Sequence, residues 1–128
     1  MASTIRDDLK YTKDHEWVKL DGDTVTVGIT DFAQDSLGDL VYVELPEAGA
    51  NFNQGDDMVI VESCKAASDV YAPINGEVVA VNDNTVDSPD LVNSSSYDDG
   101  WLVKLKVTDS SQLEALMSAA QYKEHIAD

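Results

Sequence analysis

The sequence predicts a small, mainly β protein, an antiparallel sandwich or barrel with helices at its periphery. Apolar and polar residues alternate over several short segments, a pattern typical of strands with one buried face. Glycine, proline, asparagine and aspartate interrupt these segments at close intervals, as tight turns between antiparallel strands require. With 128 residues, 43% of them hydrophobic, the chain can form a core and is expected to be one domain, 1–128.

One short helix and three strands are expected in the first half of the chain. Thr30 can cap the helix through its side-chain oxygen, and Gly38 supplies the residue type that commonly ends one. Proline has no amide hydrogen for a strand ladder, so Pro46 ends the third strand. The expected elements are strands over 16–20, 24–29 and 40–45, a turn at 21–23 and a helix over 31–37.

The second half continues the strand-and-turn pattern on both sides of a polar interruption at 62–68. The apolar segment 58–61 is suited to burial on both faces. Residues 82–99 are rich in asparagine, aspartate and serine and are expected to form a loop. A Ser-x-x-Glu capping box at 111–114, followed by apolar residues at helical spacing, predicts a helical segment over about 110–126. Further strands are expected over 69–72, 77–81 and 101–107, and the helical stripe comprises Leu113, Leu116, Met117 and Ala120.

The charge balance is strongly acidic, with 25 acidic residues against 8 basic ones and a formal charge of −17. Nucleic acids and anionic membranes bind clusters of lysine and arginine, so neither is an expected partner. The acidity either keeps the chain soluble, as in a saline cytoplasm, or steers it toward basic surfaces on other proteins. The N-terminus shows neither an apolar signal core nor an arginine-rich transit sequence. A cytoplasmic location is therefore expected, or the mitochondrial matrix if a transit peptide has been removed.

Few residues are arranged as a catalytic or metal-binding motif requires. His15 and His125 are too few and too far apart in sequence for a metal-ligand motif, so no metal is expected. The single cysteine, Cys64, excludes an internal disulfide, and no spacing supports its pairing with His15 as an activated thiol. Glu62 and Asp69 flank a predicted turn, where paired acids are usually solvated. No catalytic residue is therefore assigned.

Lys65 is the residue most suited to chemistry. It lies between two strand segments, at the expected tip of a hairpin, and is the only basic residue between Lys19 and Lys104. Its neighbours Ala66 and Ala67 are small, so its amine would project into solvent uncrowded. Lysine amines are mostly protonated at neutral pH, so acylation needs an enzyme that activates the acyl group. On spacing alone, an ordinary surface lysine is the commoner interpretation.

The segment 55–73 resembles the attachment hairpin of lipoyl carriers, and it reads GDDMVIVESCKAASDVYAP. Its continuation at 76–78 and Asn82 fits a pattern that lipoyl and biotinyl domains share. Biotin carriers usually have methionine on both sides of the lysine. Here Cys64 and Ala66 flank it, which favours lipoate.

The rest of the chain resembles one family of lipoyl carriers, the H protein of the glycine cleavage system. The resemblance runs from about Lys10 to about His125. It departs from the family's pattern at Cys64, where valine is frequent, and at Ser96, where proline is frequent. The segments that carry it, besides the hairpin, are 15–18, 28–31, 33–34, 37–39, 43–46, 91–94 and 99–102.

The resemblance implies a barrel-sandwich hybrid fold of two small antiparallel sheets, with a short internal helix, a C-terminal helix and a lipoyl hairpin over about 55–82. It implies lipoate as the cofactor, attached covalently to Lys65, in a carrier that is not itself an enzyme. The implied partners are a pyridoxal-phosphate glycine decarboxylase, a tetrahydrofolate-dependent aminomethyltransferase, dihydrolipoamide dehydrogenase and a lipoate ligase or lipoyltransferase. Glu16 and Asp69 are candidates for sheltering the arm, because carboxylates would hold its cationic cargo. Plain surface solvation of the two acids is the alternative.

Three alternatives stay open from the sequence. An H-protein-like carrier in lipoate relay or sulfur oxidation would show nearly the same pattern. A lipoyl domain of a 2-oxoacid dehydrogenase would usually continue into linkers and a catalytic domain, whereas this sequence ends at Asp128. A purely structural or ion-binding acidic module is the least favoured, because 83–90 lacks the glycine and the terminal glutamate of a calcium loop.

Overall fold

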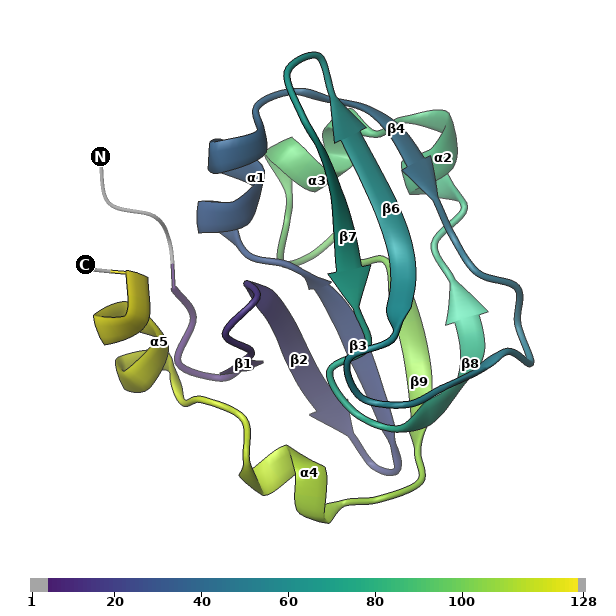
Figure 1. The fold of residues 1–128 in the computed structure, drawn as a ribbon, viewed down its shortest axis with the longest axis vertical. Coiled ribbons are helices and arrows are strands. Elements are labelled where there is room, and N and C mark those ends of the chain that lie inside the picture. The colour runs from purple at the N-terminus through teal and green to yellow at the C-terminus, as the bar shows by residue number, and fades with distance from the viewer. Residues whose placement is uncertain (1–4, 127–128) are drawn as a thin grey trace.

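The computed structural model describes residues 5–126 and contains two antiparallel sheets with short helices around them (Figure 1). The six-stranded sheet has the order β1-β2-β3-β9-β8-β5, and the three-stranded sheet has the order β4-β6-β7. This arrangement confirms the fold class that the sequence predicts. The larger sheet comprises β1 (Lys10–Tyr11), β2 (Glu16–Asp21), β3 (Thr24–Ile29), β5 (Asn51–Phe52), β8 (Gly76–Val81) and β9 (Val103–Val107); the smaller comprises β4 (Leu40–Glu44), β6 (Asp57–Ser63) and β7 (Ala67–Tyr71).

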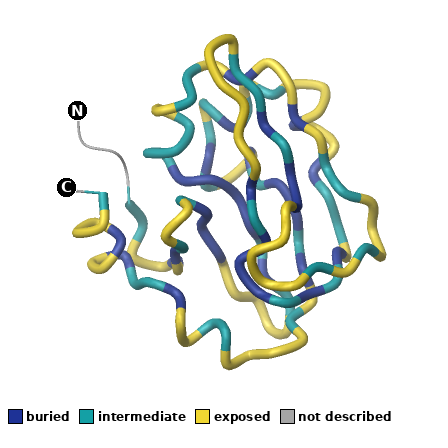
Figure 2. The backbone as a smooth tube through the Cα atoms, viewed as in Figure 1, coloured by how far each residue is buried: buried dark blue, intermediate teal, exposed yellow. Residues whose placement is uncertain are grey.

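An aliphatic core holds the two sheets together. Val27 of β3 and Leu105 of β9 contribute to it from the larger sheet, and Val61 of β6 and Val70 of β7 contribute from the smaller. Each of these side chains is at most 2% exposed. Figure 2 shows the buried stretches inside the molecule and the exposed ones at its turns. Because such cores are close-packed, the strands hold the turns at their ends in fixed places.

The helix α1 (Asp31–Leu37) begins and ends where the sequence predicts. The hydroxyl of Thr30 accepts a hydrogen bond from the amide of Ala33 (3.2 Å) and so fills the N-cap role. At the other end the amide of Gly38 donates to the carbonyl of Gln34 (2.9 Å). Gly38 has φ 85° and ψ −165°, a backbone conformation that glycine alone adopts readily. The chain turns from there into β4.

The polar segment 82–99, which was expected to be a loop, contains the short helices α2 (Asn84–Asp87) and α3 (Asp90–Ser94). Thr85 and Val92 are fully buried and anchor one helix each. Helices of 4 and 5 residues are too short to show an apolar repeat, so the composition indicated only a loop. Across residues 5–126, no helix is long and apolar enough to cross a membrane.

The C-terminal segment is helical in two pieces, α4 (Ser111–Glu114) and α5 (Ala119–Ile126). Between them, Met117 forms a β-bridge with Tyr11: its amide donates to the Tyr11 carbonyl (2.8 Å), and its carbonyl accepts from the Tyr11 amide (2.9 Å). The predicted helical stripe is therefore wrong at Leu116 and Met117, which both lie between α4 and α5. The ring of Tyr122 in α5 stacks on the ring of Tyr11 at 4.6 Å, which holds α5 against β1.

The capping box predicted at 111–114 is also wrong. The N-cap of α4 is Ser110, one residue earlier, and its side chain makes no capping hydrogen bond. The hydroxyl of Ser111 donates instead to the carboxylate of Asp109. The pattern located a helix start correctly to within one residue, but a different local contact satisfies the serine.

Candidate functional site

Lys65 lies at the tip of the β6–β7 hairpin, which projects at the top of the molecule in Figure 1. Ser63 closes the turn: its amide donates to the carbonyl of Ala66 (2.8 Å), and its hydroxyl accepts from the amides of Lys65 (3.3 Å) and Ala66 (3.1 Å). Lys65 itself is exposed, as the sequence predicts. The turn is thus fixed by its backbone and by one serine, and the lysine amine is accessible to a partner enzyme.

The Lys65 side chain does not stand alone in solvent, contrary to the expectation that nothing crowds it. A Cβ atom placed on Gly38 would lie 3.4 Å from Lys65 Cε and 3.9 Å from Nζ. Such separations are ordinary van der Waals contacts, so the lysine stem lies beside the C-terminal end of α1. The absence of a side chain at Gly38 leaves open space next to the amine.

Glu16 is a buried carboxylate at the start of β2, only 2% exposed. Its Oε1 accepts from the hydroxyl of Thr12 (2.6 Å), and its Oε2 accepts from the amide of Tyr71 (3.2 Å). Burial raises the pKa of Glu16 from 4.5 to about 7, and the two hydrogen bonds only partly offset that effect. The alternative of plain surface solvation is therefore wrong for Glu16. Near neutral pH, this carboxyl group can gain or lose a proton readily.

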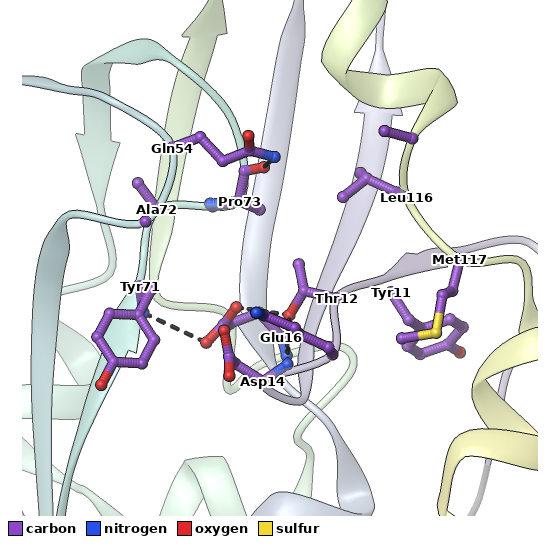
Figure 3. Close-up of a pocket in the computed structure, with 13 residues that line it drawn as sticks. Tyr11, Thr12, Asp14, Glu16, Gln54, Tyr71, Ala72, Pro73, Leu116 and Met117 are labelled. Carbon is purple, nitrogen blue, oxygen red and sulfur yellow. Dashed lines mark hydrogen bonds between the residues drawn. The ribbon is translucent and has the colours of Figure 1, made fainter.

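A cavity of about 460 Å³ opens next to Glu16 (Figure 3). Figure 3 shows the carboxylate of Glu16 between the hydroxyl of Thr12 and the backbone of Tyr71, with the apolar side chain of Leu116 across the cavity. The walls come from the β1–β2 and β5–β6 turns, the end of β7 with the residues after it, and the chain between α4 and α5. The lining residues are Tyr11, Thr12, Lys13, Asp14, Glu16, Gln54, Gly55, Tyr71, Ala72, Pro73, Ala115, Leu116 and Met117.

Asp69 lies on the exposed face of β7, between Lys65 and the Glu16 cavity. Side chains two residues apart in a strand share a face, so Asp69 and Tyr71 point the same way while Val70 enters the core. Tyr71 lines the Glu16 cavity and also a smaller one of about 300 Å³ that includes Asp69. At roughly 3.3 Å per strand residue, Asp69 is up to about 13 Å along the chain from Lys65, and Tyr71 up to about 20 Å. Asp69 thus lies on the strand that begins beside the lysine, and Glu16 of β2 is hydrogen-bonded to the far end of that strand.

Two partners of Glu16 were not found from the sequence. Thr12 carries a weak signal, because a threonine four residues before a glutamate in a polar turn can bond the local backbone. Its oxygen does accept from the amides of Asp14 (3.2 Å) and Glu16 (3.1 Å). Tyr71 acts through its backbone amide, which no residue type reveals.

The two histidines lie together, although they are far apart in sequence. The ring centroids of His15 and His125 are 5.6 Å apart, and His15 Nδ1 lies 2.8 Å from the hydroxyl of Tyr122. Burial, with the nearby His125, lowers the pKa of His15. Cys64 is exposed at the hairpin turn, so the structure gives no support to a Cys64–His15 pair. Within 5–126, no group of three or more metal-ligating side chains gathers.

The model of the family described as glycine cleavage H-protein matches residues 9–128. The chain belongs to this family. It is 54% identical over 127 residues to a glycine cleavage system H protein of Escherichia coli and 53% identical to one of Salmonella arizonae, each match covering 98% of both chains. The crystal structure of a glycine cleavage system H protein from Mycobacterium marinum is also similar. Its TM-score is 0.87 at 38% identity, and the match covers 97% of this chain and 100% of that one.

As a glycine cleavage H-protein, the chain is a lipoyl-carrier component of the glycine cleavage system. These near full-length matches do not favour the lipoate-relay, sulfur-oxidation or 2-oxoacid dehydrogenase alternatives. The presence of serine at position 96, where the family often has proline, has a simple structural explanation. The indole Nε1 of Trp17 donates to the Ser96 carbonyl (2.8 Å), and a proline at this position would supply the same acceptor.

Proposed function

We propose that lipoate is joined by an amide to Lys65 and that this arm carries the aminomethyl group of glycine. The main supporting observation is the exposed Lys65 at the tip of a hairpin whose sequence matches the attachment pattern. The proposed partners are the pyridoxal-phosphate glycine decarboxylase, the tetrahydrofolate-dependent aminomethyltransferase, dihydrolipoamide dehydrogenase, and a lipoate ligase or lipoyltransferase. The chain provides no catalytic residue in this scheme.

The surroundings of Lys65 suit an amide-linked arm. Acylation removes the lysine charge, so the extended arm is nearly neutral and can lie against a partly apolar surface. Gly38 presents no side chain to it, and the Ser63 contacts fix the backbone below it. The dithiolane of lipoate would supply the sulfur that accepts the aminomethyl group and the disulfide that is later re-formed. A rigid hairpin confines that group to a small volume, which raises its effective concentration at a docked enzyme.

Glu16 and Asp69 are the proposed shelter for the loaded arm. The aminomethyl amine is a cation, and a cation favours the ionised form of a nearby carboxyl group. With a pKa of about 7, Glu16 can accept a neutral arm while protonated and a cationic arm while ionised. Asp69 lies between Lys65 and Tyr71, the end of β7 that contacts Glu16. It therefore adds negative charge between the attachment lysine and Glu16. We infer that the arm lies back along β7 once it is loaded.

The test starts from the chain purified without lipoate. Incubation with lipoate ligase, ATP and lipoate should increase its intact mass by one lipoyl group, and peptide mapping should locate that group on Lys65. The lipoylated protein should then support exchange of labelled carbon dioxide into glycine by glycine decarboxylase. Lipoylation without carbon dioxide exchange would indicate that the chain carries lipoate in another pathway. Lipoylation at a different lysine would show that Lys65 is not the attachment site.

A further inference from the structure

The surface next to Lys65 is a sharp corner between α1 and β4. Gly38 forms the corner. A Cβ atom added to Gly38 would have Lys65 Cε as its nearest neighbour, at 3.4 Å. The positive φ of 85° at Gly38 is accessible to glycine but does not fix the corner, because glycine is also the most flexible residue. Other contacts must therefore hold it in place.

Asn93 of α3 makes those contacts with one side-chain amide. Its Nδ2 donates to the carbonyl of Gly38 (2.9 Å) and to Oε1 of Gln34 (2.9 Å), and its Oδ1 accepts from the amide of Leu40 (2.9 Å). Both amide hydrogens are used, and the bonds reach the last turn of α1, the corner and the first residue of β4. A single side chain more than fifty residues away in sequence thus clamps both sides of Gly38.

The same corner is tied to the hairpin that carries Lys65. Leu40 pairs with Ser63 in the β4–β6 ladder, and Ser63 is the residue whose hydroxyl closes the Lys65 turn. The lysine therefore stands between two supports: the turn below its backbone and the Gly38 corner beside its stem. Asn93 fixes the second support relative to the first.

We propose that Asn93 is a positioning residue for the attachment lysine. By holding the Gly38 corner, it restricts the directions in which the Lys65 stem, and the arm attached to it, leave the hairpin. An enzyme that docks on the hairpin then meets the amine in one orientation. The inference rests on the proposed function for its enzymatic consequence, but the restriction of the lysine stem is a property of the chain itself.

Two variants of Asn93 and one matched control test this. Asn93→Ala removes all three bonds. Asn93→Asp keeps the shape and the acceptor for Leu40 but replaces the donor facing Gly38 with an oxygen. The control is Asn82→Ala, because buried Asn82 likewise donates two bonds, to the carbonyls of Asp99 and Trp101, in a different part of the chain. Thermal unfolding measures the loss of stability in each variant, so that an Asn93 variant is compared with a control of similar stability. All assays are run well below the lowest Tm.

The kinetic readout is lipoylation of the unmodified chain by lipoate ligase. Loss of orientation lowers the fraction of docked complexes in which the amine can react, so kcat should fall by about tenfold in both Asn93 variants. The KM for the chain should stay within about twofold, since the docking surface is unchanged. Asn82→Ala should keep both constants. A wild-type kcat in the two Asn93 variants, or an equal fall in Asn82→Ala, would overturn the proposal.

A second readout needs no lipoate. Reductive methylation with labelled formaldehyde places ¹³C-methyl groups on the lysine amines, and the signal missing from Lys65→Arg identifies Lys65. Its shift should move, and its line should narrow, in Asn93→Asp and not in Asn82→Ala. If the Lys65 signal is unchanged in Asn93→Asp, the positioning role is wrong even if lipoylation proceeds. If the signal changes but wild-type protein is never lipoylated, the proposed function is wrong and the restriction of the lysine stands.

Discussion

The two ends of strand β7 differ in almost every physical respect. At one end, Lys65 is exposed on a turn, and its stem lies beside the backbone of Gly38. At the other end, the amide of Tyr71 donates to Glu16, which is 2% exposed, also bonded to Thr12, and has a pKa of about 7. One end is accessible from solvent, and the other holds a buried carboxyl group.

The difference between the two ends suits the proposed role of a lipoyl carrier. An arm must be attached where large enzymes can reach it, which requires an exposed tip. The proposed cationic cargo would rest where a carboxyl group can pair with it, and the Glu16 end provides one. A single strand connects the two ends, so the proposed arm would move between them without any change in the fold.

Lys65→Arg should abolish lipoylation, because the guanidinium keeps the positive charge but does not form the amide. Intact mass after treatment with lipoate ligase measures this directly. Lys19→Arg, on an exposed part of β2, is the matched control and should be lipoylated at the wild-type rate. Both proteins should unfold at the same temperature. A lipoyl mass on the Lys65→Arg chain would place the attachment site elsewhere.

Glu16→Gln should shorten the lifetime of the loaded arm by about tenfold or more. A hydrogen bond to a charged group contributes roughly 1.5–3 kcal/mol, and the neutral amide loses the charge that would hold the cation. The measurement is release of ammonia and formaldehyde from the aminomethyl-loaded protein in the absence of partners. Lipoylation of Glu16→Gln at Lys65 should be normal, because the two ends of β7 act independently. An unchanged lifetime would remove Glu16 from the proposed shelter.

Asp69→Asn should shorten the same lifetime by no more than about fivefold. Asp69 is exposed, and an exposed ion pair contributes at most about 1 kcal/mol. Added salt should reduce the difference between Asp69→Asn and wild type, while the larger effect of Glu16→Gln should persist. Asp21→Asn, at the exposed end of β2, serves as the control and should behave as wild type. A greater loss of lifetime in Asp69→Asn than in Glu16→Gln would contradict the expectation that the buried acid matters more than the exposed one.

Cys64→Val should have no measurable effect on lipoylation or on glycine exchange. Cys64 precedes the attachment lysine and is exposed, so a valine can occupy the position without displacing packed atoms. The assays use all three partner enzymes, so that a role in any one step is detected. If exchange falls strongly while lipoylation is intact, the thiol participates in the cycle.

The attachment end of β7 was predictable from the sequence because its signals are local. A lone basic residue among small neighbours, between two strand patterns, draws attention to Lys65, and the resemblance of segment 55–73 to a lipoyl hairpin selects it. Thr30 with Gly38 locates α1 to the residue. Each of these signals depends on residue types within a few positions of one another. Tight turns and helix caps are determined at that range.

The buried end was only partly predictable, because its contacts join distant segments. Its charge and its place in the family-like segment 15–18 make Glu16 a candidate, but neither its burial nor its pKa follows from the neighbouring residues. Tyr71 donates to it through a backbone amide 55 positions away. Asn93 was likewise invisible as a clamp, since its three bonds cross from α3 to the corner at Gly38. Met117 was misassigned for the same reason: a long-range bridge to Tyr11 outweighed its local helical spacing.

The most direct test of the central claim is the titration of Glu16 in the two states of the arm. Protein labelled with ¹³C-glutamate is lipoylated, and its carboxyl signals are followed by NMR against pH before and after loading with glycine and glycine decarboxylase. Glu16→Gln identifies the signal. Before loading, Glu16 should titrate near its pKa of about 7. After loading, the adjacent cation should lower that pKa. An identical titration in both states would show that the loaded arm does not rest at Glu16.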